Sequence, residues 1–375
     1  MRRTLSFFMA AALFLSAAGC APAAESGGED RVIKIAVMDS TSVFTADDSY
    51  ENGIVMAIED LNTLYGGQGY EISYEFYDDG GTFRQGMEAL DRIVSDPEIT
   101  AVVGTSSLNL LDVSADVLDK AGKLLVTYYS SSDRLFEQGY THVFRNCYGE
   151  MDLGGAIAGF AARRPDIRRV AVYRSDTDYE RGMVRAFLRG VEDTGVEIVD
   201  VVTTTPLDSE LDAAILRWRD LGVDTVLVSQ YDSEDSFEIL RRVRALNPEI
   251  NILGDFSFDY TDDLLANAGV SDGIYITGPV PLEDGRELDS FVERYRSRYG
   301  QEPTQWAVQL YDSIRMVVDT AVRVGSTDAD TVAQALREEK GYTGVGGTLC
   351  FDAKGRLVGR TPRIMVSGDG KFSYL

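Results

Sequence analysis

The stretch KLLVTYYSSSD, residues 123–133, runs from an apolar strand pattern directly into two tyrosines and three serines. A strand that only fills a core would normally close with a turn residue. A cluster of hydroxyl groups at the carboxyl end of a strand indicates instead that something polar is held there. The surrounding sequence supplies the other strands of such a sheet.

Short apolar runs alternate with amphipathic helical patterns along the chain, which favours an α/β fold with mostly parallel sheets. The alternation starts at Arg31 and restarts beyond residue 155, so the sequence predicts two doubly wound lobes. The predicted strands are RVIKIAV, YEISYEFYD, TAVVG and KLLVTYY in the first lobe, and RRVAVYRSD, EIVDVVTTT, DTVLVSQ, NILGDFS and GIYITGPV in the second.

Two further patterns lie toward the carboxyl end. Residues 304–325 carry an apolar stripe at helical spacing that begins at Trp306 and includes Leu310 and Ile314. Charged residues such as Arg315 lie outside this stripe, which argues against a membrane-spanning helix. The segment SGDGKF, residues 367–372, predicts a β-hairpin.

The first 19 residues have a basic start, an apolar run and small residues before Cys20, which is the pattern of a secretion signal. The segment AAGC, residues 17–20, resembles the bacterial lipobox, in which the cysteine receives lipid and becomes the new terminus. Residues 20–30 then form the lipidated cysteine and a flexible tether. We expect an extracytoplasmic protein, anchored by lipid on Cys20 to the cell membrane in the periplasm or at the outer face.

The composition and motifs exclude several classes of function. A net charge of −25 makes nucleic acid a poor partner. The sequence has no G-x-S-x-G, no H-E-x-x-H and no paired Cys/His ligand pattern. Its single histidine, His142, is expected to be a structural residue in a strand. We therefore expect no enzyme activity, no cofactor and no metal site.

Two hydroxyl clusters follow neighbouring predicted strands, and each precedes a predicted helix. Because the carboxyl ends of parallel strands meet at one edge of a sheet, hydroxyls and free N–H groups there can converge on one anion, such as a carboxylate. Alternatively, Ser131 or Ser132 only caps the helix that begins at Asp133. The candidate residues are Ser106, Ser107 and Asn109 in the first cluster, and Tyr129, Ser130 and Ser131 in the second.

Several segments, taken in their order and spacing, carry a resemblance to a known family. They are YENGIVMAIEDLN (50–62), YDDGG (77–81), AVVGTSS (101–107), the stretch from residue 123 through GYTHVFRN (139–146), and SDTDYERG (175–182). The chain resembles the type I periplasmic binding proteins, specifically the branched-chain amino acid (leucine/isoleucine/valine) receptor group of ABC transporters. The resemblance covers nearly all of residues 31–375.

The resemblance implies two doubly wound parallel-sheet lobes joined by a three-crossing hinge. Lobe one is then expected at residues 31–147 plus 282–346, and lobe two at residues 148–281 plus 347–375. A ligand would be trapped between the lobes by a hinge motion that ligand contacts favour.

Site residues carry over from the family by position. Ser131 resembles the hydroxyl residue that meets the carboxylate and ammonium groups of the ligand, and Tyr129 the residue whose backbone carbonyl accepts from the ammonium. Tyr179 resembles an aromatic residue of the second lobe that closes over the ligand.

The sequence departs from the family pattern at two positions. The first binding-loop serine aligns with Leu108, so Ser106, Ser107 or Asn109 must supply that contact. The acidic ammonium partner aligns with Phe256, while Asp255 comes one residue early; Asp232 is an alternative carboxylate.

An aromatic pocket is also expected, and it suits an apolar or cationic part of a ligand. Alternatively, two or more of these rings are core or lobe-interface packing. The rings are those of Tyr128, Tyr129, Tyr231 and Phe256.

The resemblance places Cys147 and Cys350 on strands at the hinge, which suggests a disulfide if their Cα atoms lie within about 7 Å. The alternative is two buried, small apolar residues.

These observations predict a monomeric solute-binding protein that captures a small polar ligand, an amino acid or a derivative, and delivers it to the transmembrane subunits of an ABC permease. One alternative is a ligand-sensing receptor component. Another is an amide-like, urea-like or amine ligand in place of an amino acid.

Overall fold

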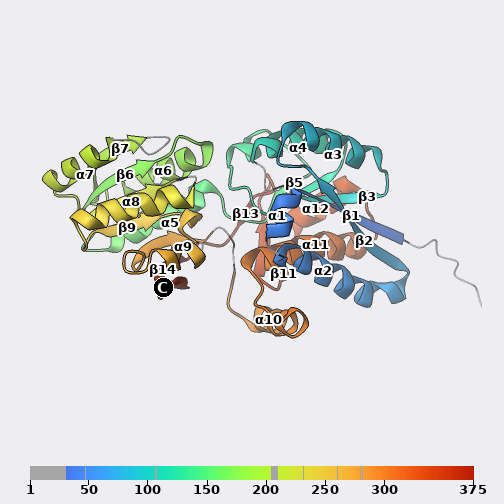
Figure 1. Ribbon diagram of the computed structural model, residues 1–375. Helices are drawn as coiled ribbons and strands as arrows, with labels where there is room; N and C mark the ends of the chain where they lie inside the picture. The colour runs from blue at the N-terminus through green and yellow to red at the C-terminus, as the bar shows by residue number, and fades with distance from the viewer. Residues whose placement is uncertain are drawn as a thin grey trace, which may run out of the picture.

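The computed structural model of the protein describes residues 31–46, 48–105, 108–203, 210–230, 232–259, 261–278, 280 and 282–375. Over these residues the chain forms two α/β lobes that lie side by side (Figure 1). The predicted α/β class and the two parallel-sheet lobes are confirmed.

Lobe one is built on a parallel sheet with the strand order β2-β1-β3-β4-β5. The order reverses at β1, because β2 lies on one side of it and the later strands lie on the other. A crevice for a ligand is expected beyond the carboxyl ends of strands at such a reversal. The strands are β1 (Arg31–Asp39), β2 (Tyr70–Asp78), β3 (Ile99–Gly104), β4 (Leu124–Thr127) and β5 (Val143–Arg145).

Each face of this sheet has its own core. Along β1, Ile33, Ile35 and Val37 pack in the core shared with α2 and α11, while Ala36 and Met38 pack in the core shared with α3 and α4. This is the two-residue alternation of a strand covered on both faces. The helices are α1 (Thr41–Ala46), α2 (Ser49–Tyr65), α3 (Phe83–Ser95), α4 (Leu108–Lys120), α10 (Arg286–Tyr299), α11 (Gln305–Val324) and α12 (Ala329–Glu338), with short 3₁₀ turns η1 (Gly66–Gln68) and η2 (Arg134–Glu137).

Lobe two contains a sheet in the order β15-β14-β10-β9-β8-β6-β7. Strands β6 to β10 pair in parallel, whereas β14 and β15 are antiparallel to their neighbours. The predicted hairpin at residues 367–372 is confirmed as the turn between β14 and β15. The strands are β6 (Arg169–Arg174), β7 (Glu197–Thr203), β8 (Thr225–Ser229), β9 (Asn251–Gly254), β10 (Ile274–Thr277), β14 (Ile364–Gly368) and β15 (Lys371–Tyr374).

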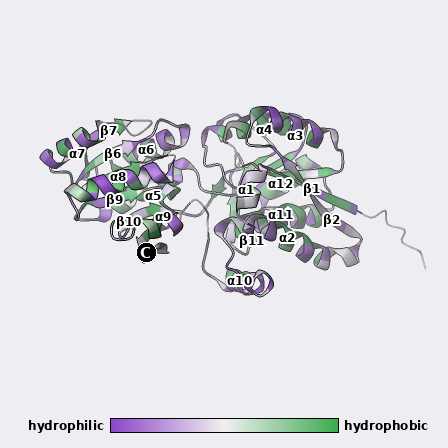
Figure 2. Cartoon of the chain, in the orientation of Figure 1, coloured by the Kyte–Doolittle hydropathy of each residue, from purple (hydrophilic) through white to green (hydrophobic). Residues whose placement is uncertain are grey.

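Helices cover lobe two on both faces of its sheet. Figure 2 shows largely hydrophobic strands between outer helices whose exposed sides carry hydrophilic residues. Trp218 of α7 is fully buried against Tyr173 of β6, with their ring centroids 6.2 Å apart. The helices are α5 (Glu150–Arg163), α6 (Asp178–Val191), α7 (Glu210–Asp220), α8 (Ser233–Leu246) and α9 (Thr261–Ala266), with the 3₁₀ turn η3 (Phe256–Phe258).

The chain crosses between the lobes after β5, after β10 and before β14. A small antiparallel sheet of β11 (Tyr342–Gly344), β12 (Gly347–Phe351) and β13 (Leu357–Val358) precedes the last crossing. Leu349, Phe351 and Leu357 pack in the core of lobe one, and the Phe351 ring lies 5.2 Å from the Phe144 ring. The expectation that lobe two resumes at residue 347 is therefore wrong, because this hydrophobic packing holds β12 and β13 on lobe one.

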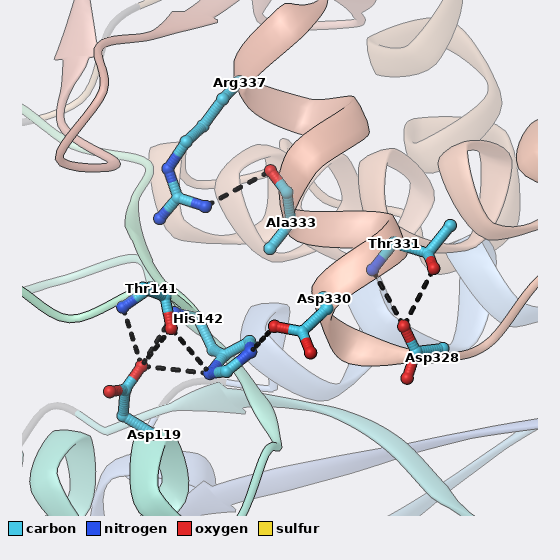
Figure 3. Close-up of polar contacts among 8 residues, drawn as sticks. All are labelled: Asp119, Thr141, His142, Asp328, Asp330, Thr331, Ala333 and Arg337. Carbon is cyan, nitrogen blue, oxygen red and sulfur yellow. Dashed lines mark hydrogen bonds and ion pairs between the residues drawn. The ribbon is translucent and has the colours of Figure 1, made fainter.

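His142 lies directly before β5 rather than inside a strand. Its Nδ1 is 3.0 Å from an Asp119 oxygen and its Nε2 is 2.9 Å from an Asp330 oxygen (Figure 3). The imidazole thus links β5 to α4 and α12 inside lobe one. This arrangement gives His142 the structural role that the sequence suggested.

Replacing Gly53 by alanine should destabilise the protein by about 1–3 kcal/mol, because α2 and α11 approach closely there. A Cβ on Gly53 would lie 2.4 Å from the carbonyl oxygen of Ala307. Gly155→Ala in α5 is the matched control, since nothing lies within 4 Å of its added Cβ. It should be neutral or stabilise the protein by up to about 1 kcal/mol. Urea unfolding of both variants measures this, and equal effects would contradict the close approach.

Candidate ligand-binding site

The loop after β4 places the second hydroxyl cluster between the lobes. Tyr128 is fully buried, and its hydroxyl donates a hydrogen bond to Asp39 at the end of β1. Burial, together with the Asp39 carboxylate, raises the pKa of Tyr128. Tyr128 therefore serves as packing, while the half-buried Tyr129 is the ring of this pair that reaches the second lobe.

Ser131 is held through its backbone and leaves its hydroxyl available. Its carbonyl oxygen accepts from Arg145 Nη1 at 3.0 Å and from the Glu150 backbone N–H at 3.0 Å. The side chain is 7% exposed, and within the described part of the chain its Oγ has no hydrogen-bond partner. Asp133 occupies the N-cap position of η2 without a side-chain cap bond, so neither serine caps that turn. The geometry fits ligand contact by Ser131 better than capping.

Arg145 fixes this loop against both lobes. Its guanidinium is 1% exposed and forms an ion pair with Asp133 at 2.8 Å. The other oxygen of Asp133 accepts from the Met151 backbone N–H at 2.9 Å, at the start of α5 in lobe two. These contacts therefore link the first crossing, the binding loop and the first turn of α5.

Ser130 supports the same loop. Its Oγ accepts from the Ser132 N–H at 3.4 Å, and its carbonyl oxygen accepts from the Cys147 thiol at 3.2 Å. This makes Ser130 a loop-stabilising residue that is 1% exposed.

The first hydroxyl cluster lies largely beyond the described residues. This holds for Ser106 and Ser107, and for the side chain of Asn109. Thr105, just before them, is buried and donates to Asp79 at 2.6 Å. The loop after β3 is thereby tied to the loop after β2 at the same edge of the sheet.

The second lobe contributes Tyr179 from the first turn of α6. Its side chain is 9% exposed, and its hydroxyl has no hydrogen-bond partner among the described residues. Burial raises the pKa of Tyr179, and the nearby Asp255 carboxylate acts in the same direction. Tyr179 is therefore a neutral hydroxyl that remains free to contact a ligand.

Asp255 and Phe256 follow β9 and point to different surroundings. Asp255 is buried, accepts from Ser229 Oγ at 2.6 Å and from the Ser257 N–H at 3.0 Å, and has its pKa raised by burial. The Phe256 ring instead lies 5.2 Å from Tyr179 and 6.5 Å from Tyr129. The one-residue offset thus sets a phenyl ring between the lobes and the carboxylate behind it.

Asp232 is exposed at the N-cap of α8, where it accepts from the Glu234 N–H at 2.8 Å. This contact gives it a capping role. Tyr231, its neighbour, lies outside the described residues.

A row of aromatic rings crosses from one lobe to the other. The ring centroids of Trp306 and Tyr129 in lobe one are 4.9 Å apart, and the row continues through Phe256 to Tyr179 in lobe two. Sequence reasoning missed Trp306, because its place in the apolar stripe of α11 predicted core packing. It is the first residue of that stripe and lies in the first helical turn, where the stripe reaches the lobe surface.

Two carboxyl groups with raised pKa values, the buried Glu180 and the half-buried Glu150, lie near Tyr179. Glu180 is 1% exposed, and burial raises its pKa to about 7. Burial, followed by the Asp133 charge, raises the pKa of Glu150 to about 8. One Glu180 oxygen, Oε2, is buried without a hydrogen-bond partner in the described chain. Lobe two therefore presents an unpaired carboxyl oxygen on the residue after Tyr179, which suits a ligand that carries an ammonium group.

The cysteine prediction is wrong. Cys147 and Cys350 are both free thiols. The Cys147 thiol, in the buried first crossing, donates to the Ser130 carbonyl. The Cys350 thiol, on β12, donates to the Lys340 carbonyl at 3.3 Å. Each thiol is held by a different backbone carbonyl, so the two sulfur atoms do not meet.

Across the described residues, no cluster of three or more metal-ligating side chains is found. No described helix is both long enough and apolar enough to cross a membrane.

Comparison with known proteins agrees with this geometry. The model of a family described as periplasmic binding protein matches residues 32–371. The chain belongs to this family. It is a family of binding proteins, so the protein is a binding protein and not an enzyme.

Among curated relatives of this periplasmic binding protein, the leucine-, isoleucine-, valine-, threonine- and alanine-binding protein of Pseudomonas aeruginosa is 24% identical, over 83% of this chain and 82% of that one. A solved ABC transporter substrate-binding protein from Desulfitobacterium hafniense, in complex with Leu, has a TM-score of 0.81 at 25% identity, covering 92% of this chain and 100% of that one. LivJ from Streptococcus pneumoniae, in complex with isoleucine, shares the fold, with a TM-score of 0.76 at 22% identity, covering 91% of this chain and 98% of that one.

Glu180→Gln should stabilise the protein more at high pH than at low pH. The folded-state pKa of about 7 lies above the ordinary value of 4.5, so the folded protein keeps a proton that the unfolded chain has already released. The free energy of unfolding therefore falls as the pH rises from 4.5 to about 7, and the full loss of stability is present above that pH. We expect a gain of roughly 2–3 kcal/mol near pH 8 and almost none near pH 4.

Urea unfolding at both pH values measures this gain. Glu192→Gln is the matched control, because Glu192 is exposed just beyond the same helix. A gain for Glu180→Gln that does not depend on pH would contradict the buried carboxyl.

Proposed function

We propose that the protein is a lipid-anchored, extracytoplasmic solute-binding protein that captures an α-amino acid between its lobes and delivers it to an ABC permease. The observation that carries this proposal is the pairing of free groups across the lobe boundary. The hydroxyl of Ser131 on lobe one and the hydroxyl of Tyr179 on lobe two are both nearly buried and lack partners in the described chain.

The chemistry of each group matches one part of an amino acid. The Ser131 hydroxyl and nearby backbone N–H groups suit the carboxylate, since buried carboxylates need hydrogen-bond donors. The Tyr129 carbonyl suits the ammonium group. The aromatic row from Trp306 to Phe256 suits an apolar side chain. The relatives whose names include leucine, isoleucine and valine support a ligand of this type.

The first test is calorimetric titration of the protein after it has been unfolded and refolded to strip any ligand. Leucine, isoleucine, valine, the other amino acids, small amides and polyamines serve as probes. We expect an α-amino acid to bind with a Kd of about 1 μM or tighter. Binding of an amide or an amine, together with no measurable binding of any amino acid, would overturn the amino-acid assignment.

Ser131→Ala should weaken the binding of that amino acid by about tenfold or more, because a charge-assisted hydrogen bond is lost. Ser132→Ala is the matched control and should change the Kd by less than about twofold. If the two serine variants bind equally well, Ser131 does not contact the ligand.

Cys20→Ser should release the protein from the membrane. Cys20 lies outside the described residues, so the anchor rests on the AAGC pattern at residues 17–20. Detergent phase partitioning should recover the native protein in the detergent phase and the variant in the aqueous phase. Labelling with radioactive palmitate should mark the native protein alone; equal labelling of both proteins would rule out this cysteine.

A further inference from the structure

A second crevice lies between the lobes, beside the candidate ligand site. Its volume is about 340 Å³, and its lining includes residues of the loop after Ser131 and Asp178, just before Tyr179. Such a volume lies at the small end of ligand pockets. Its basic lining residues are Arg134, Lys354 and Arg356 from lobe one, and Arg181, Arg185 and Arg189 from lobe two.

The lobe-two cations share one face of α6. Arg181, Arg185 and Arg189 follow one another at intervals of four residues, so their side chains lie in a row about 12 Å long. Lys354 and Arg356 face them from the turn between β12 and β13. Cations of both lobes therefore line the same cavity.

Part of this positive charge is uncompensated. Arg181 pairs with Asp178, Arg356 pairs with Asp352 at 2.7 Å, and Arg134 pairs with Asp112 at 3.3 Å. By contrast, Arg185, Arg189 and Lys354 have no carboxylate within ion-pair distance among the residues that the structure describes. In a chain with a net charge of −25, such a grouping requires an explanation.

The acidic groups of the crevice do not supply the missing charge. Asp133 is engaged by the buried Arg145 guanidinium, and Asp178 by Arg181. Burial raises the pKa of Glu150 to about 8, so this carboxyl is largely neutral at pH 7. Glu137, on the lobe-one side, is the remaining carboxylate of the lining and has no ion-pair partner in the described chain.

We propose that this crevice binds a multivalent oxyanion of phosphate or pyrophosphate size, held between Arg185 and Arg189 of lobe two and Lys354 of lobe one. Guanidinium groups present paired N–H donors that match phosphate oxygens, and lysine adds a point charge. Because its contacts come from both lobes, the anion favours their approach. If the proposed function holds, the bound anion also raises the affinity for the amino acid, since binding at one site shifts the same equilibrium as binding at the other.

The test is calorimetric titration of the purified protein with inorganic phosphate and with pyrophosphate, in chloride buffer of constant ionic strength and without any amino acid. The result then does not depend on the proposed function. We expect saturable binding with a stoichiometry of one. The double variant Arg185→Ala/Arg189→Ala should weaken it by at least about tenfold, and Lys354→Ala should also weaken it.

The matched control is Arg84→Ala/Arg286→Ala, which removes the same charge from exposed positions elsewhere. It should bind the anion as the native protein does. Glu137→Gln should tighten binding, because it removes a carboxylate from the crevice.

Three results would overturn the proposal: no saturable binding by the native protein, an equal loss in the control variant, or unchanged binding in Arg185→Ala/Arg189→Ala. Unchanged binding in Lys354→Ala would overturn the bridging of the two lobes. Thermal melting of each variant without anion verifies that the substitutions leave the fold intact.

Discussion

The buried Arg145 guanidinium is the interaction on which the site depends. It reaches the Ser131 carbonyl and the Asp133 carboxylate, while Asp133 also accepts from the first turn of α5 in lobe two. Leaving the Arg145 charge buried without Asp133 would cost about 3–5 kcal/mol. This cost keeps the binding loop, the first crossing and the start of α5 in one arrangement, and it leaves the Ser131 hydroxyl free.

The loop that Arg145 holds also borders two spaces between the lobes, and these spaces differ in charge. On one side of the loop after Ser131 lies Tyr179, followed in the chain by Glu180 with its unpaired carboxyl oxygen, which suits an ammonium group. On the other side, the arginines of α6 form a basic surface. Since both spaces are lined by both lobes, closure of the lobes changes the surroundings of both.

Features that depend on residues adjacent in the chain were predicted from the sequence, whereas features that depend on distant segments were missed or wrong. The hydroxyl cluster at residues 128–132 was found from the sequence, because a strand and the loop that follows it are adjacent in the chain. Trp306 was missed, because the sequence pattern of an apolar helical stripe is the same whether its first ring packs in a core or against another lobe. The cysteine pairing and the boundary at residue 347 were wrong, because both depend on which distant segment packs against β12.

The sequence by itself determined the α/β class, the two lobes, the binding family and the loop that carries Ser131. These properties arise from side-chain periodicity and from residue types at strand ends, which are local. Tertiary structure alone decided that Phe256 faces the cleft while Asp255 lies behind it, that Trp306 joins the aromatic row, and that cations of α6 meet those of the β12–β13 turn. Each of these depends on the packing of segments that are far apart in the chain, and no local pattern encodes that packing.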